Sequence, residues 1–212
     1  MAITILCSSK EHPIYSYIIE WANSNSKKHN ISVLNKGQEV TSGDMLFLIS
    51  CTEVIGKNIR DNFKHTLVIH ESDLPHGRGW SPLIWQIIEG QDRITITLFD
   101  AVDDVDAGDV WTKETIHIEN HEIIDEVNYK LFSAKLKLVD FAIENMNKII
   151  QTPQSNIESS NYTRRTPEDS KLDINKSIAD QFDLLRIVDK KRYPCFIEHR
   201  GHKYKITMEK IK

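Results

Sequence analysis

The order of apolar segments along the first 90 residues is the feature that most constrains the fold. Short apolar runs rich in β-branched side chains predict buried strands at residues 2–7, 31–34, 45–50 and 66–70. Residues 13–22 place apolar side chains at helical spacing, and residues 58–63 suit a short helix. Strands that alternate with helices predict an α/β fold with a doubly wound, mostly parallel sheet flanked by helices.

The second half of the chain completes this core and then changes character. Helical patterns cover residues 80–89 and 121–150, and two strands at 94–99 and 110–118 flank an acidic loop. From residue 151 the sequence turns polar and loses its periodicity, which is typical of a linker or of a segment that wraps the core. A short helix is expected at 175–188, followed by a β-hairpin of residues 195–198 and 204–208. We therefore expect a core of residues 1–150, and a linker with a small helix and hairpin subdomain at 151–212.

Composition narrows the class of protein. The 212 residues carry a formal net charge of -4, with 40% hydrophobic and 27% charged residues, which fits a soluble globular chain. A mildly acidic chain lacks the positive field that nucleic acids attract, and no apolar run approaches the length of a membrane span. We therefore expect neither partner. Cys7, Cys51 and Cys195 lie far apart without metal-ligand spacing, which favours free thiols in a reducing cytoplasm.

Two loops carry the residues suited to chemistry. His70 ends a predicted buried strand and precedes a loop rich in proline and glycine, so it lies at the carboxyl edge of the sheet, where open α/β folds bind ligands. The second loop, between residues 99 and 111, gathers Asp103, Asp104, Asp106 and Asp109. Four aspartates in one loop also suit a solvated turn or a cation site, but their spacing does not match an EF-hand. We expect no metal.

The two loops together resemble the folate-dependent formyltransferase family. In that family a strand ends in Asn-x-His and continues through a serine, Leu-Pro and Arg-Gly into a helix, and Asp-x-Gly follows later. The matching residues here are His70, Ser72, Leu74, Pro75, Arg78, Gly79, Pro82, Asp106 and Gly108. The stretches YTRRTPEDSKLD and RYPCFIEHRGHKY are similar to the tail of bacterial sugar N-formyltransferases. The resemblance implies a Rossmann-like formyltransferase core.

The resemblance also implies a reaction and a set of site residues. The donor would be 10-formyltetrahydrofolate, and the acceptor the primary amine of a nucleotide-linked deoxyamino sugar, such as a UDP-4-amino-4,6-dideoxy sugar on the way to pseudaminic acid or another surface glycan. His70 would stabilise the oxyanion and assist proton transfer, and Asp106 would orient His70 and collect protons from the amine. The folate would contact Leu48, Ser50, Asp100, Asp103 and Asp104. The acceptor would contact Ser72, Arg78, Trp80, Arg164 and Arg165.

One departure keeps other interpretations open. The family's asparagine falls two residues before its histidine, where this chain has Val68. A catalytically silent module that binds folate or a nucleotide sugar is therefore an alternative, as is an acyltransferase that uses another donor. Three predicted acceptor contacts also have structural interpretations. Arg78 could hold its own loop in place, and Trp80 could be a core side chain. Arg164 and Arg165 could hold surface segments together.

Chain length, charge and tail guide the choice among branches of the family. The methionyl-tRNA branch normally carries a larger basic C-terminal domain, whereas this chain is short and acidic. The glycinamide ribonucleotide branch lacks the tail that resembles the sugar enzymes. The C-terminal hairpin presents a strand edge that a second copy could pair with, so a homodimer is allowed.

Overall fold

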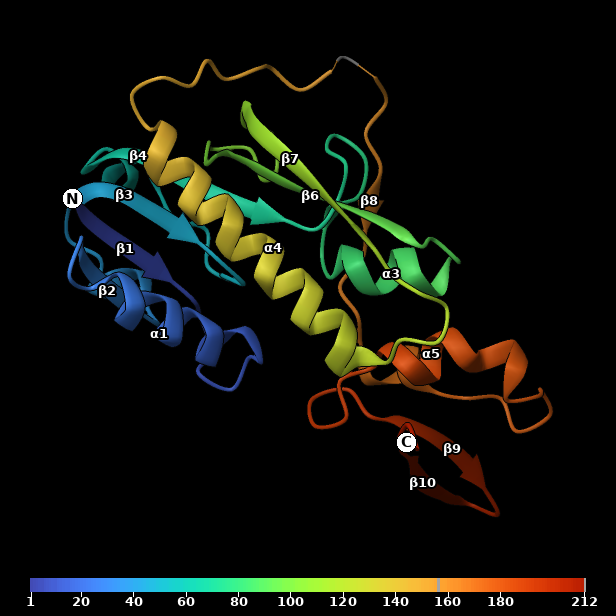
Figure 1. Ribbon diagram of the computed structural model, residues 1–212. Coiled ribbons are helices and arrows are strands. Elements are labelled where there is room, and N and C mark those ends of the chain that lie inside the picture. Colours follow the sequence, from blue (N-terminus) through green and yellow to red (C-terminus); the bar gives the residue numbers. More distant parts are fainter. Residues whose placement is uncertain (156, 212) are drawn as a thin grey trace.

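The computed structural model describes residues 1–155 and 157–211, and its centre is a six-stranded sheet of order β2-β1-β3-β4-β6-β7 (Figure 1). Its four parallel strands are β1 (Ala2–Leu6), β2 (Asn30–Leu34), β3 (Gly43–Leu48) and β4 (Phe63–His70). Two antiparallel strands extend the sheet, β6 (Arg93–Asp100) and β7 (Val110–His117). The predicted mostly parallel α/β sheet is confirmed.

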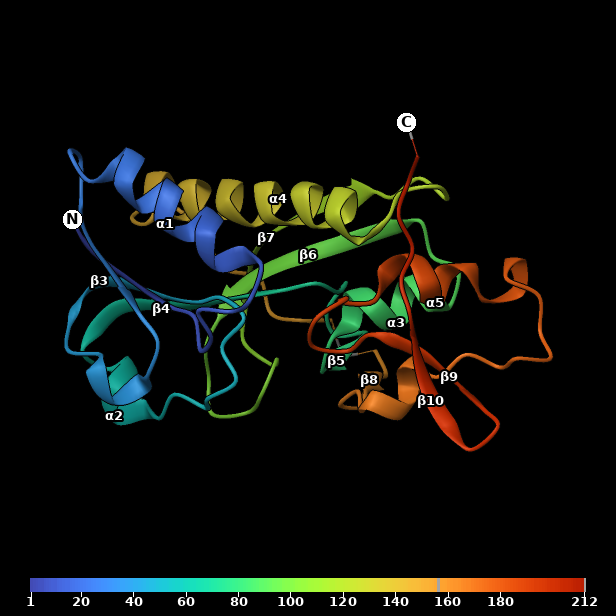
Figure 2. The same cartoon turned by 90° about the horizontal axis from the view of Figure 1, so that it is seen from below.

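Helices α1 (Ile14–Asn25) and α4 (Ile124–Asn145) cover one face of the sheet (Figure 2). Their apolar sides bury the main core against alternate strand residues. This core includes Ile3, Ile5, Ile14, Ile18, Phe47, Leu131, Phe132 and Leu138, each at most 4% exposed. The indole N–H of Trp21 donates to Asp140 at 2.9 Å and ties α1 to α4. The two helices therefore form one packed layer on this face of the sheet.

The opposite face carries shorter elements. The single-turn helix α2 (Lys57–Arg60) packs with the 3-10 turn Gly37–Glu39 over a smaller cluster that includes Leu46, Ile55 and Phe63. The helix predicted at 58–63 ends earlier because Phe63 already belongs to β4, where it is buried. Helix α3 (Pro82–Ile88) follows the His70 loop and begins with a proline in its first turn, as the sequence predicts.

The C-terminal segment passes back along the core before it forms the hairpin. Residues Asn161–Tyr162 (β8) pair in parallel with Arg78–Gly79 (β5), in the loop region between His70 and α3. The hairpin of β9 (Cys195–His199) and β10 (His202–Ile206) is confirmed, and it packs on a small cluster of Leu172, Val188 and Cys195. The segment from residue 151 is therefore integrated with the site rather than a free spacer.

The helix predicted over residues 175–188 is wrong in its first half. Only α5 (Phe182–Ile187) is α-helical, preceded by a 3-10 turn at Ala179–Gln181. Polar side chains hold the earlier backbone in turns, because Gln181 donates to the carbonyl of Asp173 at 3.0 Å and Ser177 pairs with Asp180. Such side-chain bonds compete with helix formation.

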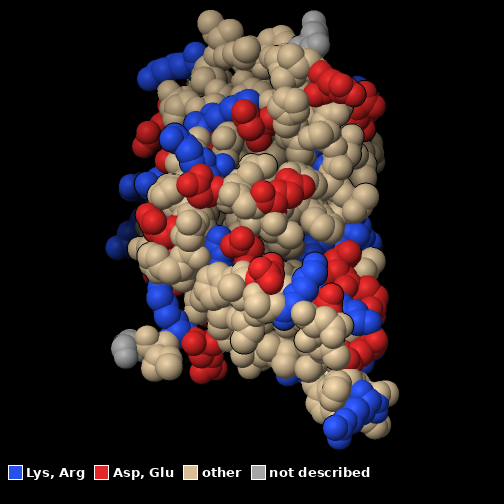
Figure 3. Space-filling view, turned by 90° about the vertical axis from the view of Figure 1, so that its right-hand side faces the viewer, with Lys and Arg blue, Asp and Glu red and all other residues tan. Residues whose placement is uncertain are grey.

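Surface charge and helix composition bear on binding to nucleic acids and membranes. On the face shown in Figure 3, Lys and Arg are interspersed with Asp and Glu, with no extended basic surface on that side. Across residues 1–155 and 157–211, no helix combines the length and apolarity needed to cross a membrane.

Candidate active site

A cavity of about 640 Å³ opens at the carboxyl ends of β3 and β4. One side is formed by the loops at residues 50–55 and 101–106. The other side is formed by α3, by α4 and by parts of residues 164–193. This is the volume range of small-molecule sites, and it lies at the sheet edge where open α/β folds bind their ligands.

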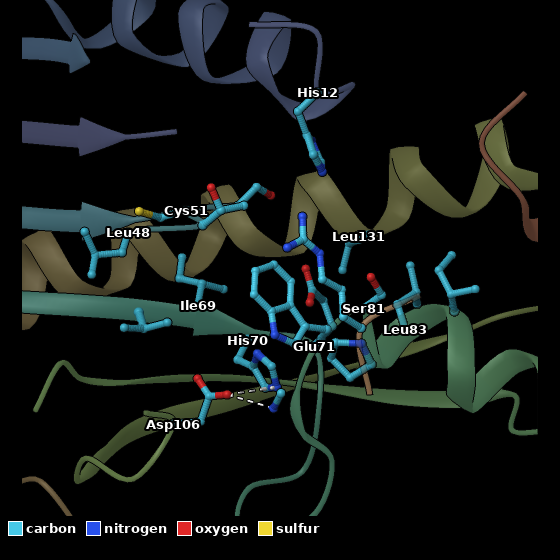
Figure 4. A pocket seen from close by; sticks show the side chains of 18 of the residues that line it. His12, Leu48, Cys51, Ile69, His70, Glu71, Ser81, Leu83, Asp106 and Leu131 are labelled. Carbon is cyan, nitrogen blue, oxygen red and sulfur yellow. Dashed lines mark hydrogen bonds and ion pairs between the residues drawn. The ribbon is translucent and has the colours of Figure 1, made fainter. Parts of the chain in front are cut away.

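His70, the last residue of β4, lines this cavity, with only 7% of the residue exposed. Its Nε2 lies 2.9 Å from the carbonyl oxygen of Gly77 and 3.9 Å from Oδ2 of Asp106 (Figure 4). A carbonyl oxygen only accepts, so Nε2 carries a proton in this arrangement. The structure thus brings the two predicted catalytic residues together.

Asp106 is held in an unusual conformation. Its φ of 55° lies in the left-handed region, which disfavours side chains with a Cβ. The N–H of Gly79 donates to its Oδ2 at 2.9 Å and fixes the carboxylate beside His70. Two residues on, a Cβ at Gly108 would overlap the carbonyl oxygen of Asp100, so the loop requires glycine there. The Asp-x-Gly spacing therefore reflects packing as well as chemistry.

Gln154 braces this loop from the polar segment that the sequence predicts to be a linker or a segment that wraps the core. Its Nε2 donates to the carbonyl oxygens of Asp106 at 2.9 Å and Gly108 at 3.0 Å. Its Oε1 accepts from Nη2 of Arg78 at 2.7 Å. Arg78 therefore links the loop after His70 to Gln154. It is not part of the cavity lining. The sequence carries no periodic signal for these contacts.

The residues predicted to hold folate divide into two groups. Leu48, Ser50 and Asp104 line the cavity. Asp100 accepts from the Trp111 indole at 3.0 Å, and burial raises the pKa of its carboxyl. Asp103 forms an ion pair with Arg60 and leaves 78% of its side chain exposed. Neither Asp100 nor Asp103 is part of the cavity lining.

The residues predicted to bind the acceptor also divide. Trp80, Arg164 and Arg165 line the cavity. The Arg164 guanidinium carbon lies 4.7 Å from the Trp80 ring centroid, which makes a cation–π pair. Arg165 is 7% exposed and donates to the carbonyl of Asp169 at 3.0 Å. Ser72 lies outside the lining and is 1% exposed, packed beneath Gly77.

Sequence reasoning missed a charged pair in this cavity. Glu71 lines it directly after His70 and forms an ion pair with Lys135 of α4, whose side chain is 1% exposed. A signal was present, because Lys135 falls four residues after Leu131 on the apolar face of the predicted helix. Burial alone would raise the pKa of Glu71, but the charges of Lys135 and His70 outweigh it and hold that pKa below its ordinary value.

Val68 occupies the position at which the resembling family has its asparagine. It lies two residues before His70 on the same face of β4, is half-buried and lines the cavity. An isopropyl group therefore stands where an asparagine amide would reach the same space.

Exposed apolar side chains on the two loops test the fit to a folate. Val54 is 75% exposed, Val102 42% and Val105 62%, and all three line the cavity. These valines offer apolar surface to the face of a flat heteroaromatic ring whose polar atoms lie at its edge. Asp104 in the same lining can accept from the N–H edge of a pterin. The residues present fit the group.

The arrangement is that of an α/β protein with a histidine–carboxylate pair in a cavity at its sheet edge. Residues 5–140 match the formyl transferase family, and the chain belongs to it. The family uses 10-formyltetrahydrofolate, so the protein is a folate-dependent formyltransferase.

Solved structures with similar folds come from several branches. Methionyl-tRNA formyltransferase from Clostridium thermocellum has a TM-score of 0.83 and 23% identity, over 100% of this chain and 94% of that one. HypX from Aquifex aeolicus in complex with tetrahydrofolic acid has a TM-score of 0.80 and 20% identity, over 97% of this chain and 37% of that one. A sugar N-formyltransferase from Shewanella sp FDAARGOS_354 has a TM-score of 0.74 and 18% identity, over 100% and 99%.

These likenesses show the fold and do not choose an acceptor. This chain covers almost all of the Clostridium structure. Chain length therefore does not separate the methionyl-tRNA branch from the sugar branch, contrary to the expectation from the sequence. The choice of acceptor rests on the cavity itself.

Proposed function

We propose that the protein transfers a formyl group from 10-formyltetrahydrofolate to the primary amine of a nucleotide-linked deoxyamino sugar. The acceptor we favour is a UDP-4-amino-4,6-dideoxy sugar used for surface glycans, pseudaminic acid among them. One observation carries the proposal: the His70–Asp106 pair lines the same cavity as the exposed valines of the two loops and the Trp80–Arg164 pair. A two-sided cavity suits a reaction between two bound molecules.

The donor side has the character that a pterin requires. Leu48, Ser50 and Asp104 would hold the ring system between the two loops, with Val54 and Val102 against its faces. When bound, the folate supplies an activated formyl group. Asp100 and Asp103 would act behind this surface, Asp100 through Trp111 and Asp103 through Arg60.

His70 and Asp106 would manage charge and protons. Nε2 of His70 is a donor next to the Asp106 carboxylate. An N–H donor stabilises negative charge that develops on a neighbouring oxygen. The Asp106 carboxylate would take up a proton from the amine. The Gly79 N–H bond keeps the carboxylate in place for this.

The acceptor side offers an aromatic ring and cations. Trp80 is 40% exposed and carries Arg164 over its ring, which suits a nucleobase beside a diphosphate. Arg165 and Arg192 also line this side. Solved structures of a sugar N-formyltransferase and of a 4-N formyltransferase share this fold over the full chain. Ser72 and Arg78 would support the site by packing and through Gln154.

The proposal has implications for organisation and setting. Residues 1–150 would carry the donor site and the catalytic pair, and residues 151–212 would close the acceptor side. Cys7, Cys51 and Cys195 are free thiols, which suits a cytoplasmic enzyme. The exposed β9–β10 hairpin would pair two copies in a homodimer, which sedimentation would test.

The direct experiment combines purified protein, 10-formyltetrahydrofolate and a panel of UDP- and dTDP-linked amino sugars. Mass spectrometry should show one added formyl group on one member of the panel, only when the folate is present. Matching sugars with a hydroxyl in place of the amine are the controls and should stay unmodified. Product on no member of the panel would contradict the proposed acceptor.

Val68 favours one second candidate, a silent module that binds folate or a nucleotide sugar without turnover. An amide is missing where the family places one, so transition-state stabilisation is reduced. The same experiment separates the two, because a silent module would bind folate in calorimetry and form no product with any amine.

A further inference from the structure

The ion pair between Glu71 and Lys135 lies at the wall of the cavity, and the His70–Asp106 pair does not use it. Glu71 follows the last residue of β4, and its carboxylate reaches toward α4. Lys135 reaches Glu71 from α4, and both are largely withdrawn from solvent, with side chains 1% and 19% exposed. Figure 4 shows Glu71 beside His70 and near Ser81 and Leu131.

Stability alone gives a weak reason for this pair. Removing two charges from water is costly, and apolar residues of similar volume often serve a fold equally well. The position of Lys135 on the apolar face of α4, among Leu131, Ala134 and Leu138, would suit leucine or methionine. A functional role inside the cavity would explain why a carboxylate stands at this wall.

The surroundings leave Glu71 as the carboxylate available to a ligand on this side. The other carboxylate of this wall, Asp189, is bound by Nε of Arg192 at 2.6 Å and by two backbone N–H groups. His12 is neutral near pH 7, because burial and the charges of Lys135 and Arg192 lower its pKa to about 4. Lys135 binds Oε1 of Glu71, so Oε2 can accept from a second donor.

We propose that Glu71 binds the amine of the acceptor and sets the preference for an amine over a hydroxyl. This rests on the proposed function and names the residue that recognises the acceptor's reacting group. Glu71 directly follows His70, so an amine or ammonium bound at Oε2 lies in the same cavity as His70 and Asp106. Lys135 keeps the carboxylate ionised, so it binds and orients the amine, while Asp106 is the proton acceptor.

The test compares Glu71→Gln with the wild type, using the reactive member of the sugar panel and 2-aminoethanol as a minimal amine. Loss of one charge-assisted hydrogen bond should raise KM for the amine by about 10- to 100-fold. KM for 10-formyltetrahydrofolate should change by less than about twofold, since Glu71 lies outside the donor loops. Glu71→Asp should recover part of the amine affinity.

Glu122→Gln is the matched control. Glu122, just before α4, pairs with Lys130 of that helix at 2.5 Å and is not part of the cavity lining. It should reproduce any loss of stability without the change in KM. If Glu71→Gln fails to fold, the double variant Glu71→Gln with Lys135→Met removes both charges together and tests the same KM.

The outcomes separate this proposal from the proposed function. An unchanged KM for the amine in both Glu71 variants would overturn the role of Glu71 and leave formyl transfer to amino sugars standing. Transfer to 2-aminoethanol but to no sugar nucleotide would overturn the acceptor class, and the Glu71 comparison would continue on 2-aminoethanol. No transfer to any amine by a folate-binding wild type would overturn both.

Discussion

The side-chain amide of Gln154 donates a hydrogen bond of 2.9 Å to the carbonyl oxygen of Asp106, a residue 48 positions earlier in the chain. The same amide bridges Gly108 and Arg78. Asp106 has a φ of 55°, so its conformation persists because neighbours fix it. The polar segment after residue 151 therefore supports the catalytic loop directly.

Gln154→Leu should reduce kcat by about tenfold, because a loosened Asp106 misplaces the carboxylate beside His70. KM for 10-formyltetrahydrofolate should change little, and steady-state kinetics separates the two parameters. Gln151→Leu, in the same segment, is the control and should keep the wild-type kcat. Equal losses in both variants would assign the effect to the segment's stability instead.

His70→Ala and Asp106→Asn should each lower kcat/KM on the order of 100- to 1000-fold, since each removes a group that manages charge in the transition state. Circular dichroism and melting should show folded protein in both cases, because both side chains lie at the sheet edge rather than in the core. Near wild-type turnover in either variant would refute the assignment of the pair.

Val68→Asn should raise kcat by about tenfold, because it places an amide donor on the face of β4 that carries His70. Stability should fall by about 1 kcal/mol, since the position is half-buried. Val68→Thr, which adds a hydroxyl with little change in shape, is the comparison. A lower kcat in the asparagine variant would mean that the site is built around valine.

Gly108→Ala should destabilise the protein far more than Gly90→Ala. A Cβ at Gly108 would overlap the carbonyl of Asp100, whereas nothing lies within 4 Å of one at Gly90. The Gly90 variant bears only the strain of a positive φ, about 1 kcal/mol. Urea denaturation should show a difference of at least about 2 kcal/mol between them. Similar stabilities would mean that the acidic loop adjusts freely.

His12 should make stability fall in mild acid. Burial, Lys135 and Arg192 lower its pKa from 6.5 to about 4, so the unfolded chain binds the proton more readily. A depressed histidine pKa contributes stability that is full above pH 6.5 and is lost as pH falls toward 4, by up to about 3 kcal/mol.

Denaturation curves between pH 4 and 7 check this, with His12→Asn as the variant. The variant should show a flatter profile over that range than the wild type. The exposed His76, changed to asparagine, should leave the profile unaltered. A wild-type profile in His12→Asn would mean that other groups dominate the acid response.

The parallel strands, the long helix and the position of His70 follow from the sequence. Apolar runs such as residues 45–50 must be buried on both faces, and the helical pattern before and after them leaves little choice of topology. The turn chemistry around Pro82 and Gly108 likewise identifies the two loops of the site. These features depend on local pattern, which a sequence carries openly.

The tertiary structure alone decided which polar residues face the cavity. Arg78 and Asp103 belong to the same loops as His70 and Asp104, but each is engaged by a distant partner, Gln154 or Arg60. Glu71 pairs with the buried ammonium of Lys135 only because α4 passes the end of β4. Pairs as short as β5 and β8 have no periodicity, so their contacts arise when segments far apart in the chain meet on the folded core.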